Sequence, residues 1–310
     1  MSSLEPSLQD EIRKGLRERP RWLPAALLYD DLGSALFEAI TYLPEYELTR
    51  ADFALLEKES ARHLSTLKGP IEVVELGPGA GRKALVLLKA LLARQTEARF
   101  VAVDVSAEAL VGCRRLLEVL PGLRVDAIQA TYIEGLERAP RTGATRLVCF
   151  LGSNLSNFNR ADQRAFFAAV RARLQPGDGL LIAADLEKSP GQLLPAYDDA
   201  LGVTAAFNRN VLVRLQREAG STLPLESFKH QVRWNAEGRR VEMHLEALEP
   251  VAGHVLGVPV RLEQGETLWT ESSHRFSLEE LERLGTDAGF AVAHTAVASP
   301  WAFAHVLYVA

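Results

Sequence analysis

The stretch VVELGPGAGRK, from Val73 to Lys83, decides the fold. It runs from apolar residues through an acid into a glycine-rich turn and ends on two basic residues. Gly77, Gly79 and Gly81 follow the apolar run directly, a spacing that lets the backbone turn tightly after a strand and approach a ligand. The residues around this turn must indicate which ligand it faces.

Two phosphate ligands fit the turn poorly. The dinucleotide fingerprint needs a third glycine one position later, where Arg82 stands, so a nicotinamide-dependent oxidoreductase is disfavoured. A triphosphate-binding loop ends in Gly-Lys-Ser/Thr, but here Lys83 is followed by Ala84. Glu75, just before the turn, would repel a pyrophosphate and would favour a cation.

Asp104 gives a second indication, because a carboxylate at the end of the next strand can accept both ribose hydroxyls of a nucleoside. A glycine turn with a ribose acid and no phosphate signature fits S-adenosylmethionine, whose distinctive charge is a sulfonium. The alternative is a tight turn with an acid that happens to end a strand.

The order of the elements predicts an α/β fold. Short apolar segments alternate with helical patterns, which implies right-handed crossovers and a doubly wound parallel sheet. The predicted strands are 71–77, 98–105, 123–130, 145–154 and 177–186, and the helices between them include 82–95, 106–120 with Ser106 as N-cap, and 159–174.

The alternation stops near Leu186. Residues 187–275 combine helical signals with alternating segments typical of half-exposed antiparallel strands. A helix and two strands then follow up to the C-terminus. We therefore predict a discontinuous domain of residues 51–187 and 276–310, with a second α+β domain formed by residues 1–50 and 188–275.

Composition narrows the class of protein. The chain has 310 residues and a formal net charge of −5, so no basic surplus favours nucleic acid. No apolar run approaches the roughly 20 residues of a membrane span, and Met1 to Gly15 lacks a secretory pattern. Cys113 and Cys149 suit buried thiols in a reducing compartment. The expectation is a cytoplasmic monomer, without membrane or nucleic-acid partners.

Several separated stretches together resemble one known family, the histidine-specific, S-adenosylmethionine-dependent methyltransferases of ergothioneine biosynthesis. They are YDDLGSALFEAITYLPEYELTR, ELGPGAGRK, FLGSNLSNF, AYDDALGVTAAFNRNVL, VEMHL and WTESSHRFS. The resemblance runs from about Leu23 to the C-terminus. It implies a Rossmann-like methyltransferase sheet and a substrate-binding domain formed by the N-terminal segment and the insertion. The implied activity is methylation of the α-amino nitrogen of L-histidine, repeated to the trimethyl betaine hercynine.

The resemblance also implies the residues of both ligand sites. For S-adenosylmethionine these are Tyr29, Gly77, Lys83, Asp104, Thr131 and Tyr132, with Tyr29 and Lys83 at the methionyl carboxylate. For histidine they are Tyr46, Asn154, Asn157, Tyr197, Met243, Glu271 and Ser273. Asn157 and Tyr197 would hold the substrate carboxylate, while Glu271 and Ser273, helped by Tyr46, would hold the imidazole. The catalytic roles would fall on Tyr46, Asn157 and Tyr197.

Three positions depart from the family pattern. Thr131 replaces an acid that meets the adenine, and Asn154 and Ser156 replace a threonine and a glycine in the loop beside the substrate amine. These changes leave open the number of methyl groups added and the choice of substrate. The alternatives are an Nα-methyltransferase of another amino acid or of a modified histidine, and a binding protein without turnover.

No metal is expected, because the seven histidines show no ligand spacing. His274, next to the proposed pocket residues, is expected to face outward from its strand. The sequence identifies no general base, and desolvation of the amine beside a sulfonium would favour the neutral amine that the reaction needs.

Overall fold

The computed structural model describes residues 4–310, which divide into two compact units. One unit contains the residues up to Tyr46 together with Lys188–His274, and the other contains Glu47–Glu187 and Arg275–Ala310. The sequence analysis placed the divisions after residues 50, 187 and 275. The role of each unit stays a prediction.

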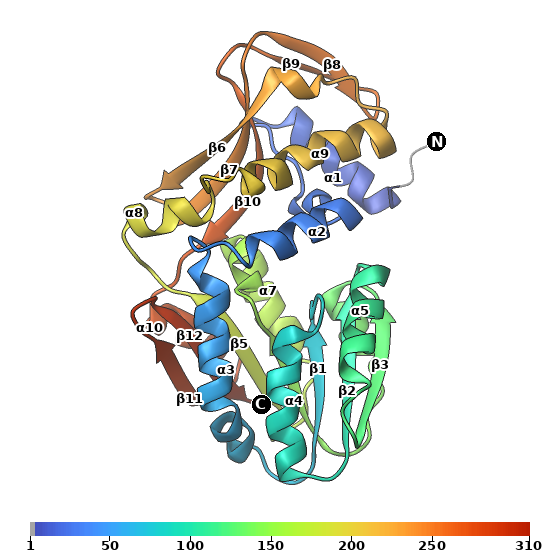
Figure 1. Ribbon diagram of the computed structural model, residues 1–310, viewed down its shortest axis with the longest axis vertical. Coiled ribbons are helices and arrows are strands. Elements are labelled where there is room, and N and C mark those ends of the chain that lie inside the picture. Colours follow the sequence, from blue (N-terminus) through green and yellow to red (C-terminus); the bar gives the residue numbers. More distant parts are fainter. Residues whose placement is uncertain (1–3) are drawn as a thin grey trace. The chain divides into compact units, whose positions relative to one another are not determined.

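The second unit is built on a seven-stranded sheet in the order β11-β12-β5-β4-β1-β2-β3 (Figure 1). β1 to β5 are parallel, and β12 pairs antiparallel with both β5 and β11. The strands are β1 Ile71–Leu76, β2 Ala98–Asp104, β3 Leu123–Gln129, β4 Thr145–Phe150, β5 Gly179–Asp185, β11 Ala291–Ala298 and β12 Phe303–Val309. The predicted doubly wound α/β fold is confirmed.

Helices cover both faces of this sheet, which is why its central strands are apolar on both sides. On one face lie α3 Glu47–Thr66, α4 Arg82–Arg94 and α5 Ala107–Leu117, next to one another (Figure 1). On the other face α6 Tyr132–Arg138, α7 Arg160–Arg171 and α10 Leu278–Asp287 pack on the main apolar core. The predicted N-cap of α5 is confirmed, since the Ser106 hydroxyl accepts a hydrogen bond from Ala109 N at 3.1 Å.

The sheet order fixes where a ligand can bind. The chain winds from β1 outward to β3 and then crosses back to β4 on the other side of β1. At such a point the connections after the two adjacent strands diverge and leave a crevice at their carboxyl ends. The glycine turn follows β1, and the short 3₁₀ helix η2, Asn154–Asn157, follows β4.

The first unit combines helices with antiparallel strands. Its main helices are α1 Pro6–Arg17, α2 Asp31–Ile40 and α9 Val203–Ala219, with a short α8 Pro190–Leu193 and the 3₁₀ turns η1 Ala25–Leu28, η3 Leu194–Ala196 and η4 Leu225–Ser227. The strands β6 Phe228–Asn235, β7 Arg240–Ala247 and β10 Thr267–His274 form a sheet in the order β10-β7-β6. β8 Val251–Val255 and β9 Val258–Leu262 form a separate hairpin. The expected antiparallel strands are confirmed.

Within residues 4–310, no helix is both long and apolar enough to cross a membrane.

Two helical glycines give a matched test of the packing. A Cβ at Gly135 in α6 would lie 2.0 Å from Val103 Cγ1, whereas a Cβ at Gly112 in α5 would meet nothing within 4 Å. We expect Gly135→Ala to lower the free energy of unfolding by about 1–3 kcal/mol, because overpacking outweighs the gain in helix propensity. Gly112→Ala should raise it by about 0.5–1 kcal/mol. Urea unfolding measures both, and a stabilising Gly135→Ala would contradict the close contact between α6 and β2.

Candidate functional site

The glycine turn after β1 is fastened to the end of β2. Gly77 N donates to Val103 O at 2.7 Å, and Gly79 N donates to Asp104 Oδ2 at 3.3 Å. The other oxygen of Asp104 accepts from Ser106 N at 3.0 Å. Burial raises the pKa of Asp104, and these backbone N–H groups counteract part of that rise. The carboxylate is therefore fixed beside the turn, at the position where a ribose acid would act.

The structure brings two predicted ligand residues, Asn154 and Tyr132, next to Gly77. A Cβ added to Gly77 would lie 3.2 Å from Asn154 Nδ2 and 3.3 Å from Tyr132 Cε1. At Gly79 a Cβ would meet no atom within 4 Å, so the turn borders open space. The Tyr132 ring packs edge-on against Phe150 at 5.0 Å between centroids, and burial raises the pKa of its phenol to about 12. A neutral aromatic wall therefore lies beside an open glycine turn.

Thr131 has a structural task that the sequence analysis missed. It is the N-cap of α6 and forms a capping box with Glu134, whose Oε2 accepts from Thr131 N at 3.3 Å. Thr131 Oγ1 also donates to that oxygen at 2.7 Å. The T-x-x-E spacing in TYIE is the sequence signal for this motif. Adenine binding by Thr131 stays a prediction.

Lys83, on the first turn of α4, forms a buried ion pair. Its Nζ lies 2.8 Å from Asp52 Oδ2, and the Asp52 side chain is fully buried while that of Lys83 is 22% exposed. Asp52 also accepts hydrogen bonds from Gly152 N at 3.0 Å and from His305 Nε2 at 2.6 Å. The Lys83 ammonium and the hydrogen bond from His305 hold the pKa of Asp52 well below its ordinary value despite its burial. Sequence reasoning missed Asp52, because its partners come from three distant parts of the chain.

Glu75, the acid before the turn, is buried inside the sheet at the end of β1. Its Oε2 has no hydrogen-bond partner among the residues described. Burial raises its pKa to about 8, helped by the charges of Asp52 and Asp104 and opposed by Lys83. The carboxyl group is therefore neutral at pH 7, and a cation placed near it would favour the charged form.

The predicted substrate residues of the first unit share one sheet. Glu271 on β10 stands opposite Met243 on β7, and Ser273 follows two residues later. Residues two apart point to the same face of a strand, and directly opposed residues share a face. A β-bulge at Thr270 interrupts the register just before Glu271. Glu271, Met243 and Ser273 are each less than a tenth exposed, so this face carries a buried carboxylate, a thioether and a hydroxyl.

Of the three predicted tyrosines in this unit, Tyr197 contacts the same face and Tyr46 packs on Tyr197. Tyr197 Oη donates to Ser273 Oγ at 2.8 Å, a contact made within the interior. The Tyr46 ring lies edge-on to the Tyr197 ring at 6.5 Å between centroids. Tyr29 packs instead against Phe37 and Phe207, at 5.7 and 5.6 Å between centroids. Cofactor binding by Tyr29 stays a prediction.

A buried hydrogen-bond network holds the backbone of Tyr197. The sequence analysis did not predict this network. His230 Nε2 donates to Tyr197 O at 2.8 Å, so its Nδ1 must accept from Asn208 Nδ2 at 2.9 Å. Asn208 Oδ1 accepts from Thr270 Oγ1 at 2.6 Å. Burial lowers the pKa of His230, which keeps the ring in the neutral form that these contacts require.

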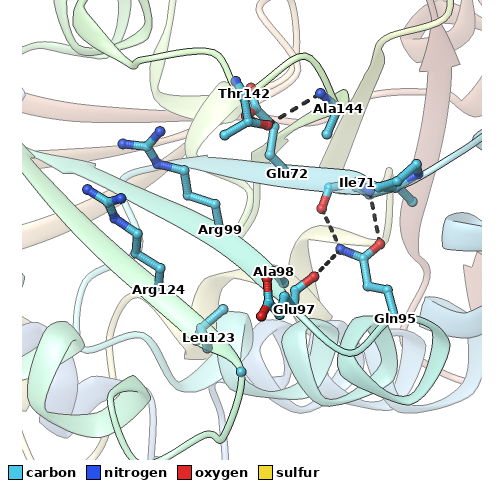
Figure 2. Close-up of a pocket in the computed structure, with 12 residues that line it drawn as sticks. Ile71, Glu72, Gln95, Glu97, Ala98, Arg99, Leu123, Arg124, Thr142 and Ala144 are labelled. Atoms are coloured by element: carbon cyan, nitrogen blue, oxygen red, sulfur yellow. Dashed lines mark hydrogen bonds between the residues drawn. The ribbon is translucent and has the colours of Figure 1, made fainter.

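One pocket of the second unit is unrelated to these residues. It has a volume of about 470 Å³ and lies among the amino ends of β1, β2 and β3, the opposite edge of the sheet from the glycine turn (Figure 2). Gln95 closes one side through hydrogen bonds with the backbone of Ile71 (Figure 2). Arg99, which also lines the pocket, pairs with Asp126 at 2.6 Å.

His274 corrects the sequence analysis. It was expected to face outward, but its side chain is only 3% exposed, because the end of β10 is covered on both faces. Among the residues described, no group of three or more His, Cys, Asp or Glu side chains is arranged to hold a metal ion.

Residues 8–310 match the model of the family described as histidine-specific, S-adenosylmethionine-dependent methyltransferases. The chain belongs to this family. The resemblance drawn from the separated motifs is therefore confirmed, and so are the expected enzyme class and cofactor.

Relatives in this family cover most of the chain. The protein is 38% identical over 297 residues to histidine N-alpha-methyltransferase from Mycolicibacterium smegmatis, covering 94% of this chain and 91% of that one. It is 38% identical to the protein of the same name from Mycobacterium tuberculosis, covering 87% and 84%. It is 31% identical to ergothioneine biosynthesis protein 1 from Neurospora crassa over 93% of this chain and 33% of that longer protein.

The buried Glu75 predicts an unusual pH dependence of stability. The folded state holds a proton that the unfolded chain releases between pH 4.5 and about 8, so this group lowers the free energy of unfolding as pH rises through that window. Glu75→Gln should remove this decline and exceed the wild-type stability at pH 8. Urea unfolding at pH 5 and pH 8 without cofactor measures it.

Glu72→Gln, on the same strand, is the control. Glu72 is buried in an ion pair with Arg146 at 2.6 Å, so its substitution should destabilise the protein at both pH values. Parallel pH profiles for wild type and Glu75→Gln would contradict the neutral state of Glu75.

Proposed function

We propose that this methyltransferase acts on the α-amino nitrogen of L-histidine and repeats the transfer to the trimethyl betaine hercynine. The observation that carries the proposal is the buried polar face of the first unit, where Glu271, Ser273 and Tyr197 gather. A carboxylate and a hydroxyl suit the two nitrogens of an imidazole. The names of the two 38% identical relatives support the same substrate.

The second unit would hold S-adenosylmethionine. Asp104 would accept the ribose hydroxyls, Tyr132 and Thr131 would border the adenine, and Gly77 would let the backbone approach. Lys83 would meet the methionyl carboxylate. For Tyr29, a residue of the first unit, the same role is proposed from the family resemblance alone. The fit is supported by the open space at Gly79 and by the unpartnered Glu75 Oε2, since a nearby sulfonium would favour ionisation of that acid. The cofactor supplies a methyl carbon already activated for displacement.

The protein's main task is then to position a neutral amine. Orientation of two reactants can contribute several kcal/mol to a rate. Asn157 and Tyr197 would hold the substrate carboxylate, Asn154 would border the amine, and Met243 would pack on the ring. The catalytic roles proposed for Tyr46, Asn157 and Tyr197 are orientation and removal of water. Desolvation next to a positive charge lowers the pKa of the amine, so no dedicated base is required.

Specificity would come from the polar contacts. A site built to bond a ring N–H can reject an analogue without it by roughly 10⁴–10⁵, whereas an apolar pocket discriminates by only about 10–200-fold per methylene. A ligand lacking the imidazole could not make the hydrogen bond proposed for Glu271. We also propose a cytoplasmic location, which the buried, free Cys113 and Cys149 support. The proposed oligomeric state is a monomer, which light scattering tests.

Incubation with S-adenosylmethionine and histidine, followed by mass spectrometry, tests the activity. We expect successive gains of one, two and three methyl groups on histidine. A panel of other amino acids serves as the control. Faster turnover of another amino acid, or binding of both ligands without any methylated product, would replace this proposal with one of the alternatives.

Variants of two adjacent serines and of Glu271 test the substrate face. Glu271→Ala should raise the KM for histidine at least tenfold and weaken the rejection of other aromatic amino acids. Ser273→Ala, which also removes the hydrogen bond to Tyr197, should raise the KM in the same direction. Ser272→Ala is the matched control, because Ser272 points to the other face of β10. Steady-state kinetics that do not distinguish the two serine variants would count against the assignment.

A further inference from the structure

One buried carboxylate stands outside the residues assigned so far, although it touches one of them. Asp52 lies on α3 and its side chain is completely buried. Its three donors come from separate elements: Lys83 at the start of α4, Gly152 in the turn after β4, and His305 on β12. A carboxylate ordered by three donors is a rigid acceptor.

Asp52 and Lys83 differ in their exposure to solvent, which a purely structural ion pair would not require. Asp52 is sealed from solvent, but 22% of the Lys83 side chain is exposed. An ammonium group has three N–H donors, and the Asp52 contact uses one of them. The Lys83 ammonium can therefore bind Asp52 through one N–H group and an anionic ligand through another.

The Gly152 turn lies close to the Lys83 ammonium. Gly152 has φ +76°, and a Cβ there would lie 2.8 Å from Lys83 Nζ. Asp52 Oδ2 accepts from both Gly152 N and Lys83 Nζ, so one oxygen atom fixes the distance between the turn and the lysine. Gly152 also leads into η2, which carries Asn154 and Asn157.

We propose that Asp52 is a positioning residue of the cofactor site, which fixes the Lys83 ammonium against the Gly152 turn before the methionyl carboxylate binds. Lysine has a long side chain with high rotamer entropy, and a preorganised lysine loses less of that entropy when the ligand binds. The proposal rests on the contact between Lys83 and the methionyl carboxylate proposed above.

The test compares two ligands that differ in the amino-acid part. S-adenosylhomocysteine carries the methionyl-type carboxylate and 5′-methylthioadenosine lacks it. Calorimetry gives the ratio of their dissociation constants for each variant of the full chain. Asp52→Ala should weaken S-adenosylhomocysteine about tenfold and leave 5′-methylthioadenosine within about twofold of wild type. Equal weakening of both ligands, or of neither, would overturn the proposal.

A conservative variant separates geometry from charge. In Asp52→Asn the amide oxygen can face Lys83 and Gly152 while the amide NH₂ faces His305. The His305 ring can then accept through Nε2 and carry its proton on Nδ1, which has no partner among the residues described. This variant should keep S-adenosylhomocysteine binding within about threefold of wild type. A loss as large as that of Asp52→Ala would overturn the positioning role.

Two further variants distinguish a failure of the proposed Lys83 contact from a failure of the proposed role of Asp52. Lys83→Met should lower the preference for S-adenosylhomocysteine; if it does not, the proposed Lys83 contact itself fails. A loss in Lys83→Met without a loss in Asp52→Ala would overturn only the role of Asp52. Glu72→Gln, in the buried pair with Arg146 at the opposite sheet edge, is the control and should leave the ratio unchanged.

If Asp52→Ala does not fold, Gly152→Ala takes its place. Its added methyl group would displace Lys83 Nζ, so it should also lower the preference for S-adenosylhomocysteine. An unchanged ratio in that variant would overturn the proposed placement of the ammonium.

Discussion

The second unit depends on one topological constraint: β1 has β2 on one side and β4 on the other, so the chain reverses its winding direction at β1. The cofactor residues proposed in this unit follow the carboxyl ends of neighbouring strands. The glycine turn comes after β1, Asp104 ends β2, Tyr132 follows β3 and Gly152 follows β4. Parallel strands place their carboxyl ends at one edge, and this brings residues distant in sequence within hydrogen-bonding range.

Buried charge is arranged unequally around this edge. Asp52, on α3, is stabilised as an anion by three donors. Glu75, near the end of β1, has no hydrogen-bond partner for Oε2 among the residues described, and burial raises its pKa to about 8. Lys83 lowers the pKa of both acids. Such an arrangement keeps one fixed carboxylate and one carboxyl group that responds to a nearby cation. It suits a ligand that carries both an anionic and a cationic group.

In the first unit, one buried face of the sheet carries polar side chains. The bulge at Thr270 shifts the register so that Glu271 stands opposite Met243. Asn208 links Thr270 to His230 and so to the backbone of Tyr197. A polar network with satisfied members is rigid, and rigidity is what a site that selects by hydrogen bonds requires.

The sequence by itself determined the fold class, the parallel strands and the family, because apolar runs, glycine spacing and separated motifs are local signals. It also supplied the T-x-x-E cap at Thr131, although that signal was overlooked. Only the tertiary structure decided that His274 is buried and that Lys83, Gly152 and His305 meet at Asp52. Their separations of 100 and 253 residues leave no periodic pattern, since such contacts arise from the order of strands in the sheet rather than from neighbouring residues.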